Sequence, residues 1–321
     1  MTDTTRPKRY RMVSKYYKET YGEKVYKLPV ALPLTCPNRD GSAGVGGCTF
    51  CGEIGAGYEN RPAWMTVRMQ LEENIAHIGP KYKAKKFIPY YQNFSNTYLN
   101  LDDFKSYIEQ GCIDEAVGIA IATRPDCIAD EYLDILADIR DRFQKDIYIE
   151  LGLQTVNYET LEKINRGHDL AQFIDAVLRI KRYGFNITTH MIVNLPWDTM
   201  KDTIEGARIL SALGVDQVKL HALYIVKNTL MAKWYQEGQF TLISAEEYAD
   251  RVVNFVRHLH PDIVLQRLVG RAPEDNTLFT NWSMGWWRVQ DLIDDKLDEL
   301  DAHQGDLCDY LNGKAVRKFI D

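Results

Sequence analysis

Between about residue 28 and residue 225, short apolar runs alternate with longer segments in which apolar residues recur at helical spacing. The predicted strands are Val30–Thr35, Phe87–Tyr91, Ala116–Ala122, Ile147–Leu153, Ile187–Asn194 and Gln217–Tyr224. The predicted helices are Val67–Ile78, Asp102–Gln110, Glu131–Arg142, Tyr158–Asn165, Leu170–Tyr183 and Met200–Leu213. Repeated βα units indicate a parallel sheet covered by helices. We therefore expect an α/β fold, a partial or full (β/α) TIM-type barrel, with a doubly wound open sheet as the alternative.

The pattern changes after about residue 227, which suggests three parts of the chain. We expect a basic N-terminal arm over residues 1–27, the barrel core over 28–227, and an α-rich C-terminal extension over 228–321 that packs on the barrel. Within the extension, Ala245–Leu259 and Val289–His303 have helical periodicity, and Ile263–Val269 is a possible extra strand.

Charge is unevenly distributed along the chain. The net charge is −6, yet residues 1–30 contain eight Lys or Arg against three Asp or Glu. A basic arm on an acidic body is typical either of a nucleic-acid contact or of a solubilising tail, and the composition does not separate these. No run is apolar enough for a membrane span, and the N-terminus has no apolar signal segment. We expect a cytoplasmic protein with no membrane partner.

Three of the six cysteines are clustered in a glycine-rich loop after the first predicted strand. Cys48 and Cys51 are three residues apart, and Cys36 lies at the far end of the loop. Thiolates are the ligands of iron–sulfur clusters and of zinc. Structural zinc normally has four protein ligands, and a fourth is not signalled nearby, since the next histidine is His77. The spacing favours a [4Fe–4S] cluster with one open iron, and a zinc site stays as the alternative.

Polar residues follow the predicted strands at their carboxyl ends. Gln92-Asn93 follows the second strand, Thr123 the third, Gln154 the fourth and Asn194 ends the fifth. In a barrel of this type the carboxyl ends of the strands carry the active site. These residues therefore indicate a ligand site beside the cysteine loop.

The cysteine loop resembles that of radical S-adenosylmethionine (SAM) enzymes, in the branch that contains the catalytic subunit of Elongator. The resemblance rests on Cys36 followed by Cys48-Thr-Phe50-Cys51, on residues 148–155, on Asn165-Arg166-Gly167-His168, and on residues 189–196. Short bacterial Elongator-like radical SAM proteins also share the Gln-Arg-Leu-Val-Gly pattern of residues 266–270. The resemblance covers roughly residues 20–225 and implies a barrel of the radical SAM type.

The resemblance implies that Cys36, Cys48 and Cys51 hold a [4Fe–4S] cluster whose fourth iron binds SAM. A reductant such as flavodoxin or ferredoxin would supply the electron that cleaves SAM. The residues that it makes candidates for contacting SAM are Phe50, Gln92, Asn93, Ser95, Asn96, Thr123, Glu150, Gln154, Arg166 and Asn194. Here Gln92-Asn93-Phe94-Ser95-Asn96 replaces the usual Gly-Gly-Glu, and Asn194 stands where glycine is common.

Several of these candidates also have a structural interpretation. Glu150 can form a structural ion pair, and Arg166 can cap the preceding helix at its C-terminal end. His190 and His221 interrupt predicted strands and are candidate catalytic residues. A strand histidine can equally be a hydrogen-bonded core residue.

The Elongator subunit acts on C5 of the wobble uridine of tRNA, and the resemblance implies tRNA as a substrate. About 95 residues follow the predicted barrel, too few for the acetyltransferase domain of that subunit, so we expect a change to an existing C5 side chain. Predicted phosphate contacts are the basic arm, residues 81–86, and the group Arg179, Lys181 and Arg182. Predicted base-stacking residues are Tyr58, Trp64, Trp282, Trp286 and Trp287. The alternatives are a radical SAM enzyme acting on a small metabolite and a zinc-stabilised RNA-binding protein without catalysis.

Overall fold

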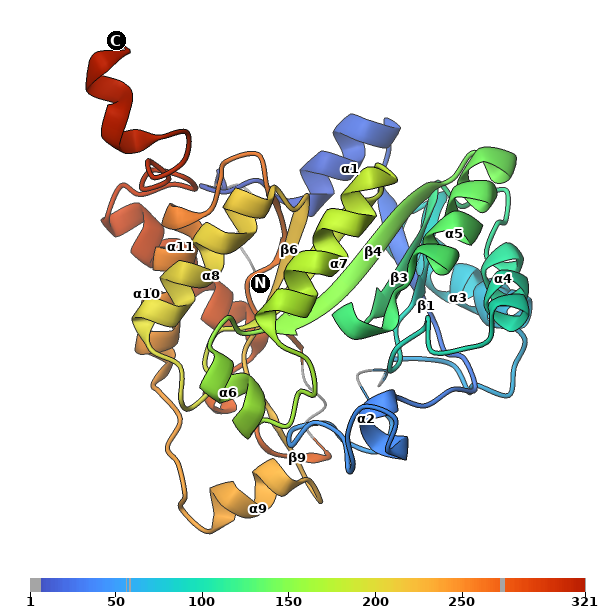
Figure 1. Cartoon of the computed structure of the whole chain (residues 1–321), viewed down its shortest axis with the longest axis horizontal. Coiled ribbons are helices and arrows are strands. Elements are labelled where there is room, and N and C mark those ends of the chain that lie inside the picture. The colour runs from blue at the N-terminus through green and yellow to red at the C-terminus, as the bar shows by residue number, and fades with distance from the viewer. Residues whose placement is uncertain (1–6, 56, 58, 272–274, 321) are drawn as a thin grey trace.

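Seven parallel strands form the central sheet of the protein in the computed structural model, which describes residues 7–55, 57, 59–271 and 275–320. The strands are β1 (Val25–Val30), β2 (Lys86–Tyr91), β3 (Gly118–Thr123), β4 (Asp146–Gln154), β5 (Asn186–Ile192), β6 (Gln217–His221) and β8 (Val264–Arg267). They pair in this order, each parallel to the next. The sheet is a half-barrel (Figure 1), which confirms the predicted partial (β/α) barrel.

Most of the helices cover the outer face of the sheet, and those that the sequence predicted bury their apolar stripes (Figure 1). The helices are α1 (Val13–Tyr21), α2 (Pro37–Asp40), α3 (Val67–Tyr82), α4 (Leu101–Gln110), α5 (Asp130–Phe143), α6 (Tyr158–Lys163), α7 (Leu170–Arg182), α8 (Met200–Leu213), α9 (Leu230–Gln236), α10 (Ala245–His258) and α11 (Trp286–Glu299). A capping box between Asp169 and Gln172 starts α7, and Gly214, at φ 60°, ends α8. None of the helices in the described part of the chain is long and apolar enough to cross a membrane.

The C-terminal part of the chain adds both helices and one strand of the sheet. The possible strand at 263–269 is observed as β8, which pairs with β6. Helix α10 packs against α8, and α11 packs against α10. A two-stranded antiparallel ribbon joins β7 (Ile225–Val226) to β9 (Thr277–Phe279).

The first strand lies five residues earlier than predicted, at Val25–Val30 instead of Val30–Thr35. The reason is Lys27, which breaks the apolar run in the sequence. In the structure its side chain is only 17% exposed and forms an ion pair with Glu150 of β4 inside the half-barrel. After β1 the chain leaves the sheet, because the Gln70 side chain of α3 binds the backbone of Ala31.

The N-terminal segment and α1 lie beside the two edge strands. The amide of Leu265 in β8 donates to the carbonyl of Arg11, at 2.8 Å. Helix α1 then contacts both β1 and β8. In Figure 1 it lies at the opposite end of the strands from α2, which belongs to the cysteine loop. The described part of the basic arm that precedes β1 is therefore placed at the amino ends of the strands.

Candidate active site

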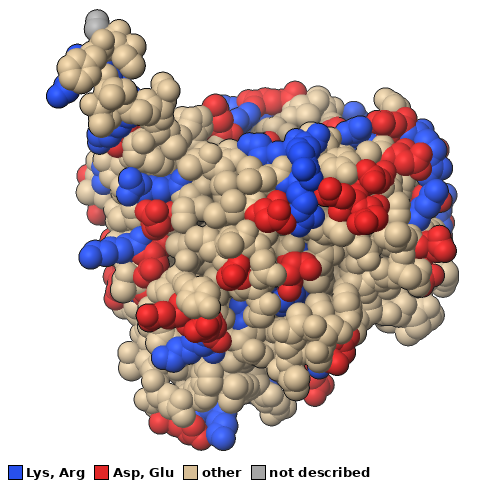
Figure 2. Space-filling model, in the orientation of Figure 1, with Lys and Arg blue, Asp and Glu red and all other residues tan. Residues whose placement is uncertain are grey.

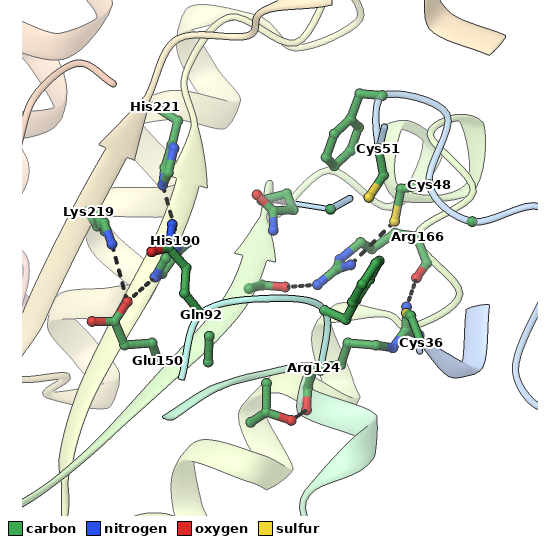
Figure 3. A pocket seen from close by; sticks show the side chains of 18 of the residues that line it. Cys36, Cys48, Cys51, Gln92, Arg124, Glu150, Arg166, His190, Lys219 and His221 are labelled. Atoms are coloured by element: carbon green, nitrogen blue, oxygen red, sulfur yellow. Dashed lines mark hydrogen bonds and ion pairs between the residues drawn. The ribbon is translucent and has the colours of Figure 1, made fainter. Parts of the chain in front are cut away.

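A cavity of about 410 Å³ opens at the carboxyl ends of the strands. It is lined by Cys36, Arg39, Gly47, Cys48, Phe50, Cys51, Gly55, Glu59, Tyr90, Gln92, Phe94, Ala122, Thr123, Arg124, Glu150, Gly152, Gln154, Arg166, His190, Lys219, His221, Tyr224, Arg267 and Arg271. Figure 3 shows the three cysteines on one side of this cavity and Glu150, His190, Lys219 and His221 on the other. We call these the cysteine wall and the histidine wall.

The cysteine wall is built by a loop with tight local turns. Cys36 precedes the short helix α2, and the amide of Cys51 donates to the carbonyl of Cys48 at 2.9 Å. Gly46 and Gly47 have φ values of 81° and 79°, a conformation that glycine adopts without steric cost. These turns place all three thiols on the lining of one cavity.

Side chains around the sulfurs donate hydrogen bonds to them. The guanidinium of Arg166 donates to Sγ of Cys48 at 3.3 Å, and that of Arg39 donates to Sγ of Cys51 at 3.3 Å. Asn38 lies 3.6 Å from Sγ of Cys48 and also donates to the carbonyl of Asn165 at 2.6 Å. Burial raises the pKa of the Cys51 thiol, and the neighbouring Cys48 adds to this. Cationic donors suit sulfurs that are bound as thiolates.

The placement of the three thiols limits the kind of metal group that they can hold. Within the described residues, no group of three or more His, Cys, Asp or Glu side chains is close enough to hold a single metal ion. A [4Fe–4S] cluster takes one thiolate at each iron, so its ligands need not meet at one point. Three thiols on a shared cavity, two of them with guanidinium donors, fit the cluster.

Arg166 reaches the cysteines because of a glycine in the neighbouring strand. Its Nη2 donates to the carbonyl of Gly152 at 2.7 Å, and a Cβ on Gly152 would lie 2.7 Å from that same nitrogen. At this point the pairing of β4 with β5 is irregular, and Gln154 has a positive φ of 79°. The irregularity ends the strand with Gln154 on the cavity lining. Arg166 is thus part of the cavity and keeps a buried Nε without a partner among the described residues.

The predicted SAM-contacting residues divide into two groups. Those that line the cavity are Phe50, Gln92, Thr123, Glu150, Gln154 and Arg166. Asn93, Ser95, Asn96 and Asn194 do not line it. Asn93 binds the backbone of Leu32, Asn96 binds the carbonyl of Ala122, and Ser95 bonds to Thr123 at 2.9 Å.

Asn194 accepts a hydrogen bond from the amide of Leu223 at 2.6 Å. The side chains of Asn93 and Asn96 likewise bind backbone atoms, and Ser95 bonds to the side chain of Thr123. These bonds hold the loops at the carboxyl ends of the strands, and a contact of the four residues with SAM stays a prediction.

The histidine wall is a network around one buried carboxylate. Glu150 is 1% exposed and forms ion pairs with Lys27 of β1 and with Lys219 of β6, the second at 3.4 Å. Its Oε2 also lies 2.6 Å from Nε2 of His190. Nδ1 of His190 is 3.2 Å from Nε2 of His221, and Nδ1 of His221 accepts from Arg267 at 2.6 Å. The structural ion pair that the sequence left open for Glu150 is present.

The pKa values in this wall reflect burial and a surplus of positive charge. Burial alone would raise the pKa of Glu150, but Lys219 and Lys27 hold it well below its ordinary value. Burial, aided by Lys219, lowers the pKa of His190 to about 4. Burial and the nearby Arg267 also hold the pKa of His221 well below 6.5, so both imidazoles are neutral at pH 7. Burial lowers the pKa of Lys219 to about 7.

Sequence reasoning missed several cavity residues. Lys219 and Arg267 lie within strands, where an apolar run gives no sign that a basic side chain faces inward. Arg39 lies in the short helix α2 and Arg271 lies outside the helices and strands, and both line the cavity. The one available signal was the Gln-Arg-Leu-Val-Gly pattern, which contains Arg267.

The predicted phosphate-binding groups lie away from the cavity. Lys8 pairs with Asp294, and Arg9 pairs with Asp298 and Asp301 of the C-terminal part. The cluster at 81–86 spans the end of α3 and the start of β2, and Arg179, Lys181 and Arg182 end α7. In a βα unit the helix ends where the next strand begins, so these groups lie at the amino ends of the strands. Figure 2 shows acidic and basic side chains intermixed on one face of the molecule.

The predicted stacking residues differ in exposure. Tyr58 lies outside the described residues. Trp282 packs against Tyr248, and its Nε1 donates to the carbonyl of Ile243 at 2.7 Å, so it belongs to the core. Trp287 is 42% exposed, and Trp64, just before α3, is 79% exposed. A helix that follows a strand begins at the carboxyl end of the sheet, so Trp64 lies at the same end as the cavity.

Comparisons with known proteins agree with this geometry. A family model described as the radical SAM superfamily matches residues 37–210, and one described as the Radical_SAM C-terminal domain matches residues 215–299. The protein YtqA of Bacillus subtilis is 33% identical over 312 residues, which is 96% of this chain and 96% of YtqA. A tRNA uridine(34) acetyltransferase of Dehalococcoides mccartyi is 24% identical over 128 residues, 39% of this chain and 27% of that protein.

A solved structure of Elp3 from the archaeon Methanocaldococcus infernus superposes on this chain with a TM-score of 0.66. The two are 14% identical, and the match covers 87% of this chain and 64% of that chain. At this identity the likeness shows that the fold is shared.

Proposed function

The chain belongs to the radical SAM superfamily, and from this premise we propose that it modifies the wobble uridine of tRNA with a [4Fe–4S] cluster held by Cys36, Cys48 and Cys51. Members of the superfamily use such a cluster together with SAM. The assignment of the ligands is supported by the position of the three thiols on one cavity and by the cationic donors to two of them.

SAM would occupy the cavity between the two walls. Gln92, Thr123, Gln154 and Arg166 offer amide, hydroxyl and guanidinium groups on its lining, beside the ring of Phe50. A guanidinium is suited to a carboxylate, and within the described residues Arg166 uses only Nη1 and Nη2 as donors. Bound there, the cluster and SAM supply a 5′-deoxyadenosyl radical that abstracts a hydrogen atom from the substrate.

The residues of this chain hold the site in place. Arg124 is 2% exposed, and its guanidinium binds both carboxylate oxygens of Asp126, at 2.8 and 2.6 Å. Its third donor holds the carbonyl of Arg166 at 2.8 Å. The loop after β3 is thereby joined to the segment that places Arg166 against Cys48. This connection fixes the cysteine wall relative to the sheet.

The charge of the cavity is the main observation in support of a nucleic acid as the substrate. Among the described residues, six basic side chains line it, namely Arg39, Arg124, Arg166, Lys219, Arg267 and Arg271, against the two carboxylates of Glu59 and Glu150. A positive cavity favours an anionic substrate. The exposed Trp64 at the same end of the sheet can stack on a base. The similarity to a tRNA uridine(34) acetyltransferase adds to this support.

The test uses tRNA from cells that lack this protein. The reconstituted protein is incubated anaerobically with that tRNA, SAM and dithionite. The tRNA is then digested, and the masses of its nucleosides are measured by mass spectrometry. We expect a mass change confined to a wobble uridine, together with 5′-deoxyadenosine. The control is the Cys36→Ala/Cys48→Ala/Cys51→Ala protein, which should leave the nucleosides unchanged.

A different outcome would favour the small-metabolite alternative. If the wild-type protein forms 5′-deoxyadenosine but no nucleoside changes mass, the tRNA proposal is wrong while the radical chemistry stands. A metabolite extract would then replace tRNA as the source of substrate in the same assay.

A further inference from the structure

We infer that the histidine wall binds an oxyanion of the substrate, a carboxylate or a phosphate, through Arg267 supported by His221. This inference rests on the proposed function in one respect, because it takes the cavity to be where the substrate binds. Its evidence is independent of the cysteines and consists of hydrogen-bond direction, charge and placement.

The hydrogen bonds of this wall run in one direction. Glu150 is ionised and accepts at Oε2, so Nε2 of His190 is the donor of that 2.6 Å bond. Nδ1 of the neutral His190 is then an acceptor, and Nε2 of His221 donates to it. His221 is left with Nδ1 as an acceptor, which receives the 2.6 Å bond from Arg267. Both imidazoles are thus held as the Nε2–H tautomer.

This direction leaves Arg267 with unused donors. The guanidinium has five N–H donors. Among the described residues it donates to Nδ1 of His221, through Nη2, and its Nε is buried without a partner there. Within the same residues it forms no ion pair with a carboxylate, whereas Arg124 across the cavity is paired with Asp126. A half-buried guanidinium without an anion is only partly solvated, so a bound anion would stabilise it.

The charges around Arg267 point the same way. Arg267, Lys27 and Lys219 face one carboxylate, that of Glu150. The two histidines between them are neutral, so they add no positive charge. Even with Lys219 deprotonated, the wall keeps a surplus positive charge. A planar guanidinium binds carboxylate and phosphate groups with two parallel hydrogen bonds, which makes an oxyanion the matching ligand.

Arg267 also has the access that a ligand needs. Both Arg267 and His221 line the cavity, and Gly270 lies next to them, where a Cβ would be 3.3 Å from Nη2 of Arg267. Figure 3 shows His221 and Lys219 on the opposite side of the cavity from Cys48 and Cys51. An anion bound here would hold the substrate on the wall that faces the cysteines.

The test measures small anions on the full-length protein without its cluster, so it does not depend on SAM cleavage. The protein is labelled in its histidine rings, and His190→Gln and His221→Gln variants assign the two NMR signals. Acetate represents a carboxylate, methyl phosphate a phosphate, and acetamide is the neutral analogue of acetate. We expect acetate, methyl phosphate or both to shift the His221 signal saturably, and acetamide to have no such effect.

Matched arginine variants locate the site. Arg267→Gln should weaken anion binding about tenfold or more, the expected effect of losing a charge-assisted hydrogen bond. Arg271→Gln, at the exposed mouth of the same cavity, should change it less than about twofold. Arg267→Lys keeps the charge without the fork and should give an intermediate affinity.

Three outcomes would overturn the inference. Acetamide could shift the signal as acetate does, Arg267→Gln could bind anions as the wild type does, or Arg271→Gln could lose as much affinity as Arg267→Gln. If Arg267→Gln does not fold, the comparison of acetate with acetamide on the wild type decides. Which of the two anions binds identifies the source, and the nucleoside assay tests the proposed function separately.

Discussion

The two walls of the cavity are built in different ways. The cysteine wall comes mainly from one loop, residues 36–51, to which Arg166 is added. The histidine wall takes its charged groups from β1, β4, β5, β6 and β8, so Lys27 and Arg267 belong to one network although 240 positions separate them in the sequence. The thiols of the first wall receive hydrogen bonds from neighbouring side chains, and the charged groups of the second wall mostly pair with one another. Our proposals assign the radical chemistry to the first wall and substrate placement to the second.

The largest expected effect belongs to the cysteine wall. Cys48→Ala should abolish formation of 5′-deoxyadenosine, because it removes a thiolate ligand that receives hydrogen bonds from two side chains. Visible absorbance and iron content after reconstitution measure the cluster directly. Cys308→Ala, which changes a cysteine away from the cavity, should retain both. Full iron content and activity in Cys48→Ala would contradict the proposal that the cysteine wall holds the cluster.

The next effect concerns stability and belongs to the histidine wall. Glu150→Gln should lower the free energy of unfolding by about 3–5 kcal/mol, because it leaves buried cations without their anion. Urea denaturation measures this. The matched control is Glu109→Gln, which breaks a partly exposed ion pair with Arg142 and should cost about 1 kcal/mol or less. Equal costs in the two variants would contradict the role of Glu150 as the anchor of the wall.

A smaller effect depends on pH. Burial lowers the pKa of Lys219 to about 7, whereas in the unfolded chain it is near 10.5. The unfolded chain then binds more protons between these values, so this group makes stability rise as the pH increases from about 7 to 10.5. Between pH 7 and pH 9.5 the free energy of unfolding of the wild type should rise by roughly 1–4 kcal/mol more than that of Lys219→Met. Urea denaturation of both proteins at the two pH values measures this. The same change in the free energy of unfolding in both would show that burial does not lower the pKa of Lys219.

The cysteine wall and the histidine wall also differ in how much of each could be predicted from the sequence. The cysteine loop could be predicted because its ligands are neighbours in the chain, and the βα order because apolar periodicity is local. In the histidine wall, Glu150, His190 and His221 were candidates from the sequence, but their network was not predicted, since nothing local shows that Lys219 and Arg267 join them from distant strands. Lys27 even displaced the predicted first strand, because a buried lysine reads as the end of an apolar run. Asn93 and Asn96 bind backbone atoms of segments that are distant in the chain, and no local pattern shows these bonds.

The most direct test of the central claim is the yield of 5′-deoxyadenosine from the anaerobically reconstituted protein with SAM and dithionite. The wild type should form it, and the Cys36→Ala/Cys48→Ala/Cys51→Ala protein should form none. Product from the triple variant, or none from a wild-type protein that carries a full complement of iron and sulfide, would contradict the account.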